Sequence, residues 1–313
     1  MSRFIYGPGL CLTALLLIPI GTVTAATLHV NCAAREGLHS IGAALKVLQN
    51  VPGPSTIDVS GECNEDVVIQ GMDRVTLNGL PGASINDPSS GNNTTLLIID
   101  SRTITVNNFV INGYASGTSG NDVVDCARAS ICVFKGNTVQ NAPQGAGIGV
   151  YSGSYADIEG GILQNNAGWT GLAVAHGARA LAIGVTLQRN WRGAVIYDGA
   201  HLQFGNSTST ANTDVGFMLR QGGTLICQGC TVTGNSSEGV HLEENSVGSF
   251  IGNFSVTGNT GAGVRLLNGS NASFLGGGNV TNNNGGQGDV VCNPHFTTVA
   301  GSPDTVGTIV GCP

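Results

Sequence analysis

Residues 147–266 repeat one short motif, a glycine followed by alternating apolar positions. The motif reads Gly147-Ile148-Gly149-Val150, Gly171-Leu172-Ala173-Val174, Gly193-Ala194-Val195-Ile196, Gly216-Phe217-Met218-Leu219, Gly239-Val240-His241-Leu242 and Gly263-Val264-Arg265-Leu266. Successive glycines that open the motif are 24, 22, 23, 23 and 24 residues apart. A period this short and regular indicates an array of stacked structural repeats.

A series of asparagines keeps the same period, and each repeat holds about three short apolar runs; the series is Asn141, Asn165, Asn190, Asn212, Asn235, Asn259 and Asn283. A strand–helix–strand unit needs about 30 residues or more and a propeller blade about 40, so neither fits. One coil of a parallel β-helix fits, with successive coils about 4.8 Å apart. Because a solenoid end exposes strand edges, we expect a capping helix within Glu36–Asn50, where Leu38, Ile41, Leu45 and Leu48 share one face.

Composition limits the partners and the compartment. The net charge of −7, with 12 basic against 19 acidic residues, argues against nucleic acid as the main partner. Arg3, the apolar run Leu10–Ile20 and the small residues at 23–26 are typical of a secretory signal peptide. We therefore expect a signal peptide at 1–26 and one domain at 27–313, secreted as a monomer with no membrane span; a retained N-terminal anchor is the alternative.

Eight cysteines remain in the expected mature chain, an even number that suggests disulfides in an exported protein. Pairing between neighbours in sequence is predicted: Cys32–Cys63, Cys126–Cys132, Cys227–Cys230 and Cys292–Cys312. Cys227 and Cys230 also form a Cys-x-x-Cys sequence, for which a redox or zinc role is the alternative.

The N-terminal half carries a resemblance to a known family. The segment Glu36–Asn50 is followed by Thr56-Ile57-Asp58-Val59, Val67-Val68-Ile69, Val75-Thr76-Leu77-Asn78-Gly79 and Ala83-Ser84-Ile85. Together with the glycine and asparagine series, this order resembles right-handed β-helix proteins of the pectate-lyase-like superfamily. The resemblance implies an all-β, right-handed parallel solenoid. It implies no single activity, because that fold carries lyases, hydrolases, epimerases and adhesins.

Strand alternation separates inward from outward positions after each repeated glycine. The first and third positions are apolar and are expected to face inward. The second and fourth positions and the following turn are expected to face outward, and their functional groups gather in the later coils: Tyr197, Asp198, Arg220, His241, Glu243, Glu244 and Arg265. Arg220 and Glu243 are expected to be neighbours. They form either a surface ion pair or part of a functional site.

These outward residues supply the candidate site. Arg220 or Arg265 would neutralise a carboxylate or bind hydroxyls, and Asp198, His241 or Glu243 would transfer protons. Binding is expected from Glu244, Arg265 and a set of aromatic residues, which are Tyr151, Tyr197, Trp169 and Trp191. The two tryptophans occupy equivalent positions in adjacent coils, so they could stack against sugar rings or against each other.

Sequence signatures of particular enzymes are missing. The chain has no Gly-His-Gly motif, and Asn293-Pro294-His295-Phe296 lacks the acids of an Asp-Pro-His-Glu motif. Acidic residues for a calcium site are few, and calcium stays open as a ligand. Two hypotheses follow. The chain binds or modifies a polysaccharide, as a lyase, hydrolase or epimerase if it is an enzyme, or it is a non-catalytic surface or adhesion solenoid.

Overall fold

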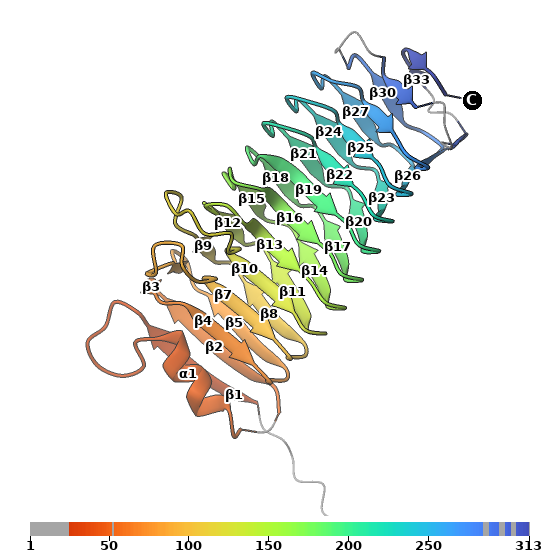
Figure 1. Cartoon of the computed structure of the whole chain (residues 1–313). Helices are drawn as coiled ribbons and strands as arrows, with labels where there is room; N and C mark the ends of the chain where they lie inside the picture. The colour runs from red at the N-terminus through yellow and green to blue at the C-terminus, as the bar shows by residue number, and fades with distance from the viewer. Residues whose placement is uncertain (1–24, 52, 284–287, 294–297, 302–304, 313) are drawn as a thin grey trace, which may run out of the picture.

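The protein is one elongated solenoid of short strands with a single helix at its N-terminal end (Figure 1). The computed structural model describes residues 25–51, 53–283, 288–293, 298–301 and 305–312. All strand pairs join parallel neighbours one coil apart, as in the pairing of β13 with β16. The predicted parallel β-helix is confirmed.

Three parallel sheets run the length of the solenoid. Sheet A has 12 strands: β1 (Ala26–Asn31), β2 (Ser55–Ser60), β5 (Val75–Gly79), β8 (Ile104–Asn107), β11 (Ile131–Lys135), β14 (Tyr155–Glu159), β17 (Arg179–Ile183), β20 (His201–Gly205), β23 (Thr224–Gln228), β26 (Val247–Ile251), β29 (Asn271–Leu275) and β32 (Thr298–Ala300). Sheet B has 11 strands: β3 (Glu62–Asn64), β6 (Ser84–Asn86), β9 (Val110–Asn112), β12 (Thr138–Gln140), β15 (Ile162–Gln164), β18 (Thr186–Gln188), β21 (Thr208–Thr210), β24 (Thr231–Thr233), β27 (Ser255–Thr257), β30 (Asn279–Thr281) and β33 (Thr305–Val306). Sheet C has 11 strands: β4 (Val67–Gln70), β7 (Leu96–Ile99), β10 (Val124–Ala127), β13 (Ala146–Val150), β16 (Thr170–Val174), β19 (Arg192–Ile196), β22 (Phe217–Leu219), β25 (Val240–Leu242), β28 (Val264–Leu266), β31 (Val290–Cys292) and β34 (Ile309–Val310).

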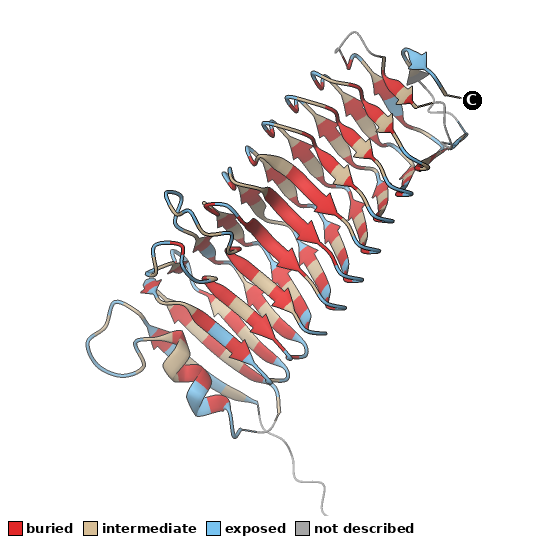
Figure 2. Ribbon diagram, in the orientation of Figure 1, coloured by how far each residue is buried: buried red, intermediate tan, exposed pale blue. Residues whose placement is uncertain are grey.

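The glycine motif lies in sheet C and has the predicted register. Ile148 pairs with Leu172, and Leu172 pairs with Ala194 in the next coil. These inward side chains are essentially fully buried. In most strands buried and exposed positions alternate, but β13 and β16 are buried along their whole length (Figure 2). Something on the outer face must therefore cover the middle of sheet C.

A ladder of buried asparagines connects the coils, and it contains the predicted Asn190, Asn212, Asn235, Asn259 and Asn283. In the first two predicted coils the register differs by one residue: Asn141 and Asn165 occupy left-handed turn positions, with φ of 68° and 56°, and the ladder begins at Asn166. Each ladder oxygen accepts hydrogen bonds from the preceding member; the members are Asn166, Asn190, Asn212, Asn235, Asn259 and Asn283. Asp289 ends the ladder by accepting from Asn283.

The glycine series and the asparagine ladder are in contact. A Cβ added at Gly216 would lie 2.9 Å from the Nδ2 atom of Asn235, and one at Gly239 would lie 2.8 Å from that of Asn259. These distances are shorter than side chains tolerate, so the two series occupy one shared space. This explains why glycine and asparagine recur with the same period.

The helix covers the N-terminal end, as expected, but it is shorter than the amphipathic stretch. α1 spans Ile41–Leu48, and the hydroxyl of Ser40 accepts a hydrogen bond from the N–H of Ala43. The Glu65 carboxylate accepts from the N–H groups of Ile41 and Gly42, at 2.6 and 3.0 Å. A carboxylate at this end stabilises the helix through its free amides and its dipole.

All four predicted disulfides are present, Cys32–Cys63, Cys126–Cys132, Cys227–Cys230 and Cys292–Cys312. Cys227 and Cys230 are both buried in the stack. They therefore form a structural crosslink between β23 and the turn that follows it, and the redox and zinc readings of Cys-x-x-Cys lose their basis.

The predicted signal peptide lies almost wholly outside the described residues and stays a prediction. β1 begins at Ala26, one residue before the expected domain start. Within the described ranges, no helix is both long and apolar enough to span a membrane.

Replacing one ladder asparagine tests the role of the ladder. Asn235→Ala removes the acceptor for the backbone and side-chain N–H groups of Asn212 and leaves the backbone N–H buried without a partner. We expect the free energy of unfolding to fall by about 2–4 kcal/mol. Denaturant unfolding measures this change. Ser236→Ala, at the exposed neighbouring position, is the control and should change stability little. Equal stability of the two variants would contradict a structural role for the ladder.

Candidate functional site

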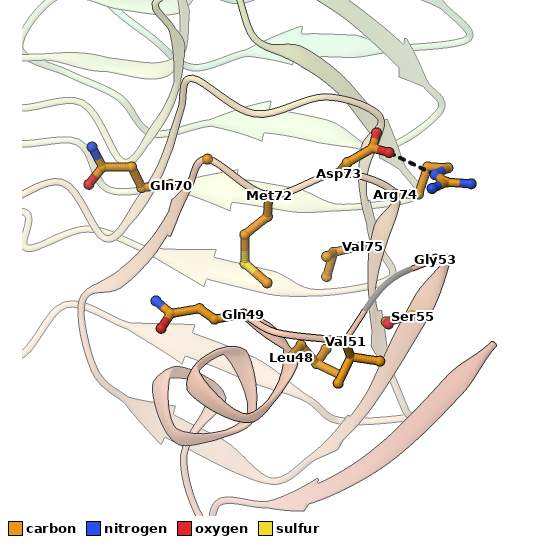
Figure 3. Close-up of a pocket in the computed structure, with 11 residues that line it drawn as sticks. Leu48, Gln49, Val51, Gly53, Ser55, Gln70, Met72, Asp73, Arg74 and Val75 are labelled. Carbon is orange, nitrogen blue, oxygen red and sulfur yellow. Dashed lines mark hydrogen bonds and ion pairs between the residues drawn. The ribbon is translucent and has the colours of Figure 1, made fainter. Parts of the chain in front are cut away.

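Two cavities lie beside the helix cap. One, of about 280 Å³, is formed where Leu48 and Gln49 of the cap face Met72 and Val75 (Figure 3). Another, of about 540 Å³, lies between the helix and β4. The ionised groups of the first cavity, Asp73 and Arg74, pair with each other at 2.8 Å. These cavities reflect how the cap packs, and neither gathers an acid, a base and an aromatic surface.

A third cavity, of about 420 Å³, opens on the outer face of sheet C. It is formed at the ends of β10, β13, β16 and β19, whose turns bring four consecutive coils to one place. It therefore lies over the covered middle of the sheet. Its lining comprises Gly120, Asn121, Asp122, Asp125, Ala127, Arg128, Tyr151, Ser152, Trp169, His176 and Tyr197. We call this cavity the sheet C pocket.

Two carboxyl groups lie at the base of the sheet C pocket. Asp122 Oδ1 accepts from the N–H of Ala146 at 2.5 Å, and Asp122 Oδ2 accepts from the Tyr151 hydroxyl at 2.7 Å. Burial raises the pKa of Asp122 well above its usual range, and the nearby charge of Asp125 raises it further. Burial also raises the pKa of Asp125. The pair therefore favours a state that retains a proton.

Gly149 makes room for this arrangement. It stands at an outward position between the two acids and the tyrosine ring. A Cβ at Gly149 would collide with the carboxylates of Asp122 and Asp125 and with the ring of Tyr151. Because Gly149 has no side chain, Asp122, Asp125 and Tyr151 can approach one another at this outward position.

The tyrosine is held as a protonated phenol. Burial raises the pKa of Tyr151 far above its usual value, and the negative charge of Asp122 adds to the effect. Its hydroxyl donates to Asp122, which fixes the direction of the O–H bond. Tyr151 can therefore keep a proton at neutral pH and release it only to a strongly basic atom placed next to it.

Rings form the outer wall of the sheet C pocket, and Arg220 borders this wall at Tyr197. The His176 ring centroid lies 6.1 Å from that of Tyr151 and 5.6 Å from that of Tyr197. Trp169 packs edge-on against Tyr197, with centroids 6.2 Å apart. The Arg220 guanidinium lies 5.4 Å from the Tyr197 ring centroid. This wall offers flat apolar surface beside a positive charge.

The wall explains a departure from the predicted alternation. Ala173, Ala175 and Val195 belong to the outward columns, yet each is fully buried. The large rings of neighbouring coils stand on the same face. The small side chains therefore form a dry floor beneath the wall, and the outward assignment alone did not predict their burial.

The turn after each sheet C strand presents one exposed residue in the left-handed conformation. Ser152, His176 and Asp198 have φ of 54°, 55° and 54°. His176 and Asp198 approach each other at 3.9 Å, and both side chains are more than half exposed. The repeated turn thereby places an imidazole and a carboxylate at the rim of the sheet C pocket.

Three predicted residues, His241, Glu243 and Arg265, form a second group farther along sheet C together with Glu238, which was not predicted. We call this group of four the distal cluster. Glu238 Oε1 lies 2.8 Å from Arg265 Nη1 and 3.8 Å from His241 Nδ1. His241 Nε2 lies 3.6 Å from Glu243 Oε2. Glu243 thus turns toward His241, and the ion-pair reading of Arg220 and Glu243 is not supported.

Two other predicted residues stand apart from both groups. The Arg192 guanidinium lies 4.1 Å from the ring centroid of Trp191 and forms an ion pair with Asp214 at 2.8 Å. Trp191 and Trp169 share no ring contact, so the two do not form a stacked platform. Glu244 is exposed at the turn with φ of 56°.

Family comparison agrees with this architecture. The family model described as a right handed beta helix region matches residues 94–284. The chain belongs to the right-handed β-helix family. None of the curated proteins is similar to it in sequence.

Solved structures share the fold at low identity. The mannuronan C-5 epimerase AlgE4 A-module of Azotobacter vinelandii matches with a TM-score of 0.60 and 14% identity, over 90% of this chain and 96% of that one. Pectate lyase Pel9A matches with a TM-score of 0.50 and 14% identity, over 92% of this chain and 78% of that one. Together with the family match, they place this right-handed β-helix with the pectate-lyase-like proteins in fold.

The sequence contained a usable signal for the residues that were missed. Asp122 and Asp125 lie one period before Ala146 and Gly149, so extending the repeat by one coil brings them beside Tyr151. His176 lies in the turn column already recognised. Glu238 directly precedes a repeated glycine. The interactions among these residues could not be read from the columns, because they depend on side-chain direction.

The donor groups fit calcium poorly. Calcium takes about 6–8 oxygen ligands, whereas the two carboxyls of the sheet C pocket already use three of their four oxygens in hydrogen bonds with Ala146, Tyr151 and Thr94. In the described part of the chain, the one convergence of three metal-ligating residues is Cys32, Cys63 and Glu65. There the sulfurs are joined in a disulfide. No chemical step is therefore derived through a metal.

The raised pKa of Asp122 predicts a pH dependence of stability. The unfolded carboxyl titrates near 3.8, and the folded one titrates higher. Between these values the folded state binds more protons, so stability should fall as pH rises from about 4, by about 1.4 kcal/mol for each unit of pKa elevation. Asp122→Asn should make this fall smaller, and the part that remains belongs to other carboxyls with a raised pKa, such as Asp125.

Thermal unfolding from pH 4 to pH 7 measures the effect. The exposed Asp198→Asn variant is the control and should keep the slope of the wild type. A slope unchanged in Asp122→Asn would show that this carboxyl does not hold its proton in the folded state.

Proposed function

We propose that this β-helix protein binds and modifies an acidic polysaccharide by proton transfer in the sheet C pocket. The observation that carries the proposal is the Tyr151 hydroxyl, hydrogen-bonded to the buried Asp122 in a pocket whose wall of rings extends to Arg220, which has no acidic partner among the described residues. The reaction class is removal of the proton next to a sugar carboxylate, followed by elimination or by return of the proton. Hydrolysis by a carboxylate pair is the less supported option, because Asp122 is held in the protein by its hydrogen bonds.

Arg220 suits recognition of a carboxylate. Within the described residues its side chain makes no ion pair or hydrogen bond, and its Nε atom is buried without a partner. An uncompensated guanidinium on a chain of net charge −7 favours an anionic group of the ligand. Neutralising a uronate carboxylate would also acidify the adjacent C–H bond, which is the bond that must break.

Tyr151 and His176 suit the two proton positions. The imidazole of His176 would accept the proton from the carbon next to the carboxylate. In elimination, the bond from the neighbouring carbon to the glycosidic oxygen then breaks, a carbon–carbon double bond forms, and Tyr151 donates its proton to the leaving oxygen. In epimerisation, no glycosidic bond breaks and Tyr151 returns a proton to the opposite face of the same carbon.

Other features support a carbohydrate as the ligand. Trp169 and Tyr197 present ring surfaces on which a sugar ring can stack. The solved structures with the same fold include proteins named as a mannuronan epimerase and a pectate lyase. Both names denote polymers of uronates, and both reactions begin at the carbon that bears the carboxylate.

The non-catalytic alternative explains less. A stiff spacer needs no buried pair of carboxyl groups, whose desolvation opposes folding at neutral pH. Four disulfides and a signal-like N-terminus favour an oxidising compartment outside the cytoplasm. We therefore propose that the protein acts as a secreted enzyme, in the periplasm, at the cell surface or outside the cell, as a monomer.

Activity on a panel of polyuronates and neutral glycans tests the proposal. Absorbance from the unsaturated product detects elimination, and proton NMR of the polymer detects epimerisation. We expect activity on at least one polyuronate and none on neutral glycans. Tyr151→Phe should lower kcat about 10²–10⁴-fold, because it removes the proton donor and keeps the ring. Tyr155→Phe, exposed on sheet A, is the control. Equal activity of Tyr151→Phe and wild type would rule out this role.

Arg220→Leu tests the substrate class separately. Loss of the carboxylate contact should raise KM and lower kcat/KM for the polyuronate by about tenfold or more. Arg179→Leu, exposed on sheet A, removes the same charge elsewhere and should leave both constants unchanged. Equal effects of the two variants would indicate a general charge effect and not recognition in the sheet C pocket.

A further inference from the structure

We propose that the distal cluster is a second sugar-binding subsite, which binds hydroxyl groups of a remote unit of the polymer held in the sheet C pocket. This inference rests on the proposed function. It adds a binding site of its own, made by Glu238, His241, Glu243 and Arg265 on β25, β28 and the turns beside them.

Unpartnered nitrogen atoms mark this surface. Among the described residues, three buried side-chain nitrogens have no hydrogen-bond partner, and they are Arg220 Nε, His241 Nε2 and Arg265 Nε. All three lie on the outer face of sheet C in consecutive coils. A buried donor without a partner costs about 1–3 kcal/mol, and native proteins rarely leave such groups unsatisfied. Their clustering indicates a place where an external molecule supplies the missing acceptors.

The acceptors of the distal cluster are fixed in place. Glu238 is almost fully buried, and its carboxylate accepts from the Ser237 hydroxyl at 2.6 Å and from Arg265 at 2.8 Å. The polar contact with His241, followed by the hydrogen bonds from Ser237 and Arg265, lowers the pKa of Glu238 strongly against the opposing effect of burial. Glu238 therefore stays ionised and orients both Arg265 and His241.

The mixture of groups favours hydroxyls over an anion. Donors from Arg265 and His241 alternate with acceptors from Glu238 and Glu243, and a sugar hydroxyl both donates and accepts. A free carboxylate or phosphate would meet two like charges here. The gap between His241 Nε2 and Glu243 Oε2 is 3.6 Å, too long for a hydrogen bond, so a ligand oxygen could bond to both atoms.

Sheet B provides an internal contrast. There the outward amides satisfy each other coil after coil, as Gln188 donates to Gln164 and Gln164 donates to Gln140, each at 2.8 Å. On sheet C, by contrast, the outward nitrogens Arg220 Nε, His241 Nε2 and Arg265 Nε are buried without a hydrogen-bond partner. The difference distinguishes a surface that only stabilises the stack from one suited to a ligand.

The position of the distal cluster sets the length of ligand that can reach it. Tyr151 follows β13 and Arg265 lies in β28, five strand steps along sheet C. At about 4.8 Å for each step, the span is about 24 Å along the solenoid axis. Arg220 lies between the two sites, so one continuous surface connects them. A single sugar unit cannot touch both sites, whereas a chain of several units can.

Chain-length dependence tests the inference. Oligosaccharides of the polyuronate identified in the activity panel, from the dimer upward, are titrated by calorimetry against the wild type and Glu243→Gln. Glu243 is partly exposed and makes no hydrogen bond through its side chain, so this variant should fold. We expect affinity for long chains to fall about tenfold, since a hydrogen bond to a charged group is lost. Affinity for the shortest ligands should be unchanged.

Two further variants keep the outcomes distinguishable. Glu62→Gln, exposed on sheet B, removes the same charge at the far end and should bind every length as the wild type does. His241→Gln should reproduce the effect of Glu243→Gln. If Glu243→Gln binds long chains as tightly as wild type, or weakens short and long chains alike, the distal subsite is wrong. If no oligosaccharide binds the wild type, the proposed function fails and the subsite fails with it.

Discussion

The buried amide ladder is the interaction on which the rest of this structure depends. Each ladder asparagine receives two hydrogen bonds from the coil before it, one from the main chain and one from the side chain, as Asn235 does from Asn212. An amide can pass this pattern on without limit, because it donates and accepts at once. The adjacent glycines complete the joint, since a side chain there would occupy the position of the amide. Height and register of the coils that share the ladder are thereby fixed from inside.

A fixed register turns the outer face of sheet C into an ordered row of positions. Residues about two dozen apart in sequence become neighbours, and a substitution in one coil is felt only beside the coils next to it. The sheet C pocket and the distal cluster are two departures from the plain repeat on this row. In each, a buried acid precedes the sheet C strand, Asp122 in one case and Glu238 in the other. Their surroundings shift their pKa values in opposite directions. Burial has the larger effect at Asp122 and raises its pKa, whereas polar contacts have the larger effect at Glu238 and lower its pKa.

Sequence alone predicted the fold and the four disulfides, because both depend on periodicity and on cysteines near in sequence. It placed the asparagine ladder one residue early in its first two coils. In the first of these, Ala142 and not an asparagine follows the left-handed Asn141, and in the second two asparagines are adjacent, Asn165-Asn166, so that composition cannot tell the turn residue from the buried one. In the next three coils Arg189, Ala211 and Gly234 hold the left-handed position, which leaves one asparagine to assign.

The candidate site was predicted only in outline. Tyr151, Tyr197 and Arg220 were assigned to the correct face, because alternation fixes the face of a residue. Which side chains meet was beyond reach, because the contacts depend on rotamers. Glu243 turned to His241 and not to Arg220, and Trp169 turned to Tyr197 and not to Trp191. Asp122 and Asp125 were missed because their coil lacks the repeated glycine by which the other coils were aligned.

At the last step of the ladder an aspartate, Asp289, stands where the series would have another asparagine, and this has a consequence for assembly. A carboxylate can receive the two hydrogen bonds of Asn283, but it has no N–H to offer a further amide, and its second oxygen already holds the N–H of Thr308. Asp289 therefore offers no hydrogen-bond donor with which another copy of the molecule could continue the ladder. A single change from amide to acid thus acts as a chain terminator and opposes end-to-end growth into fibres, the hazard inherent in any solenoid with open strand edges.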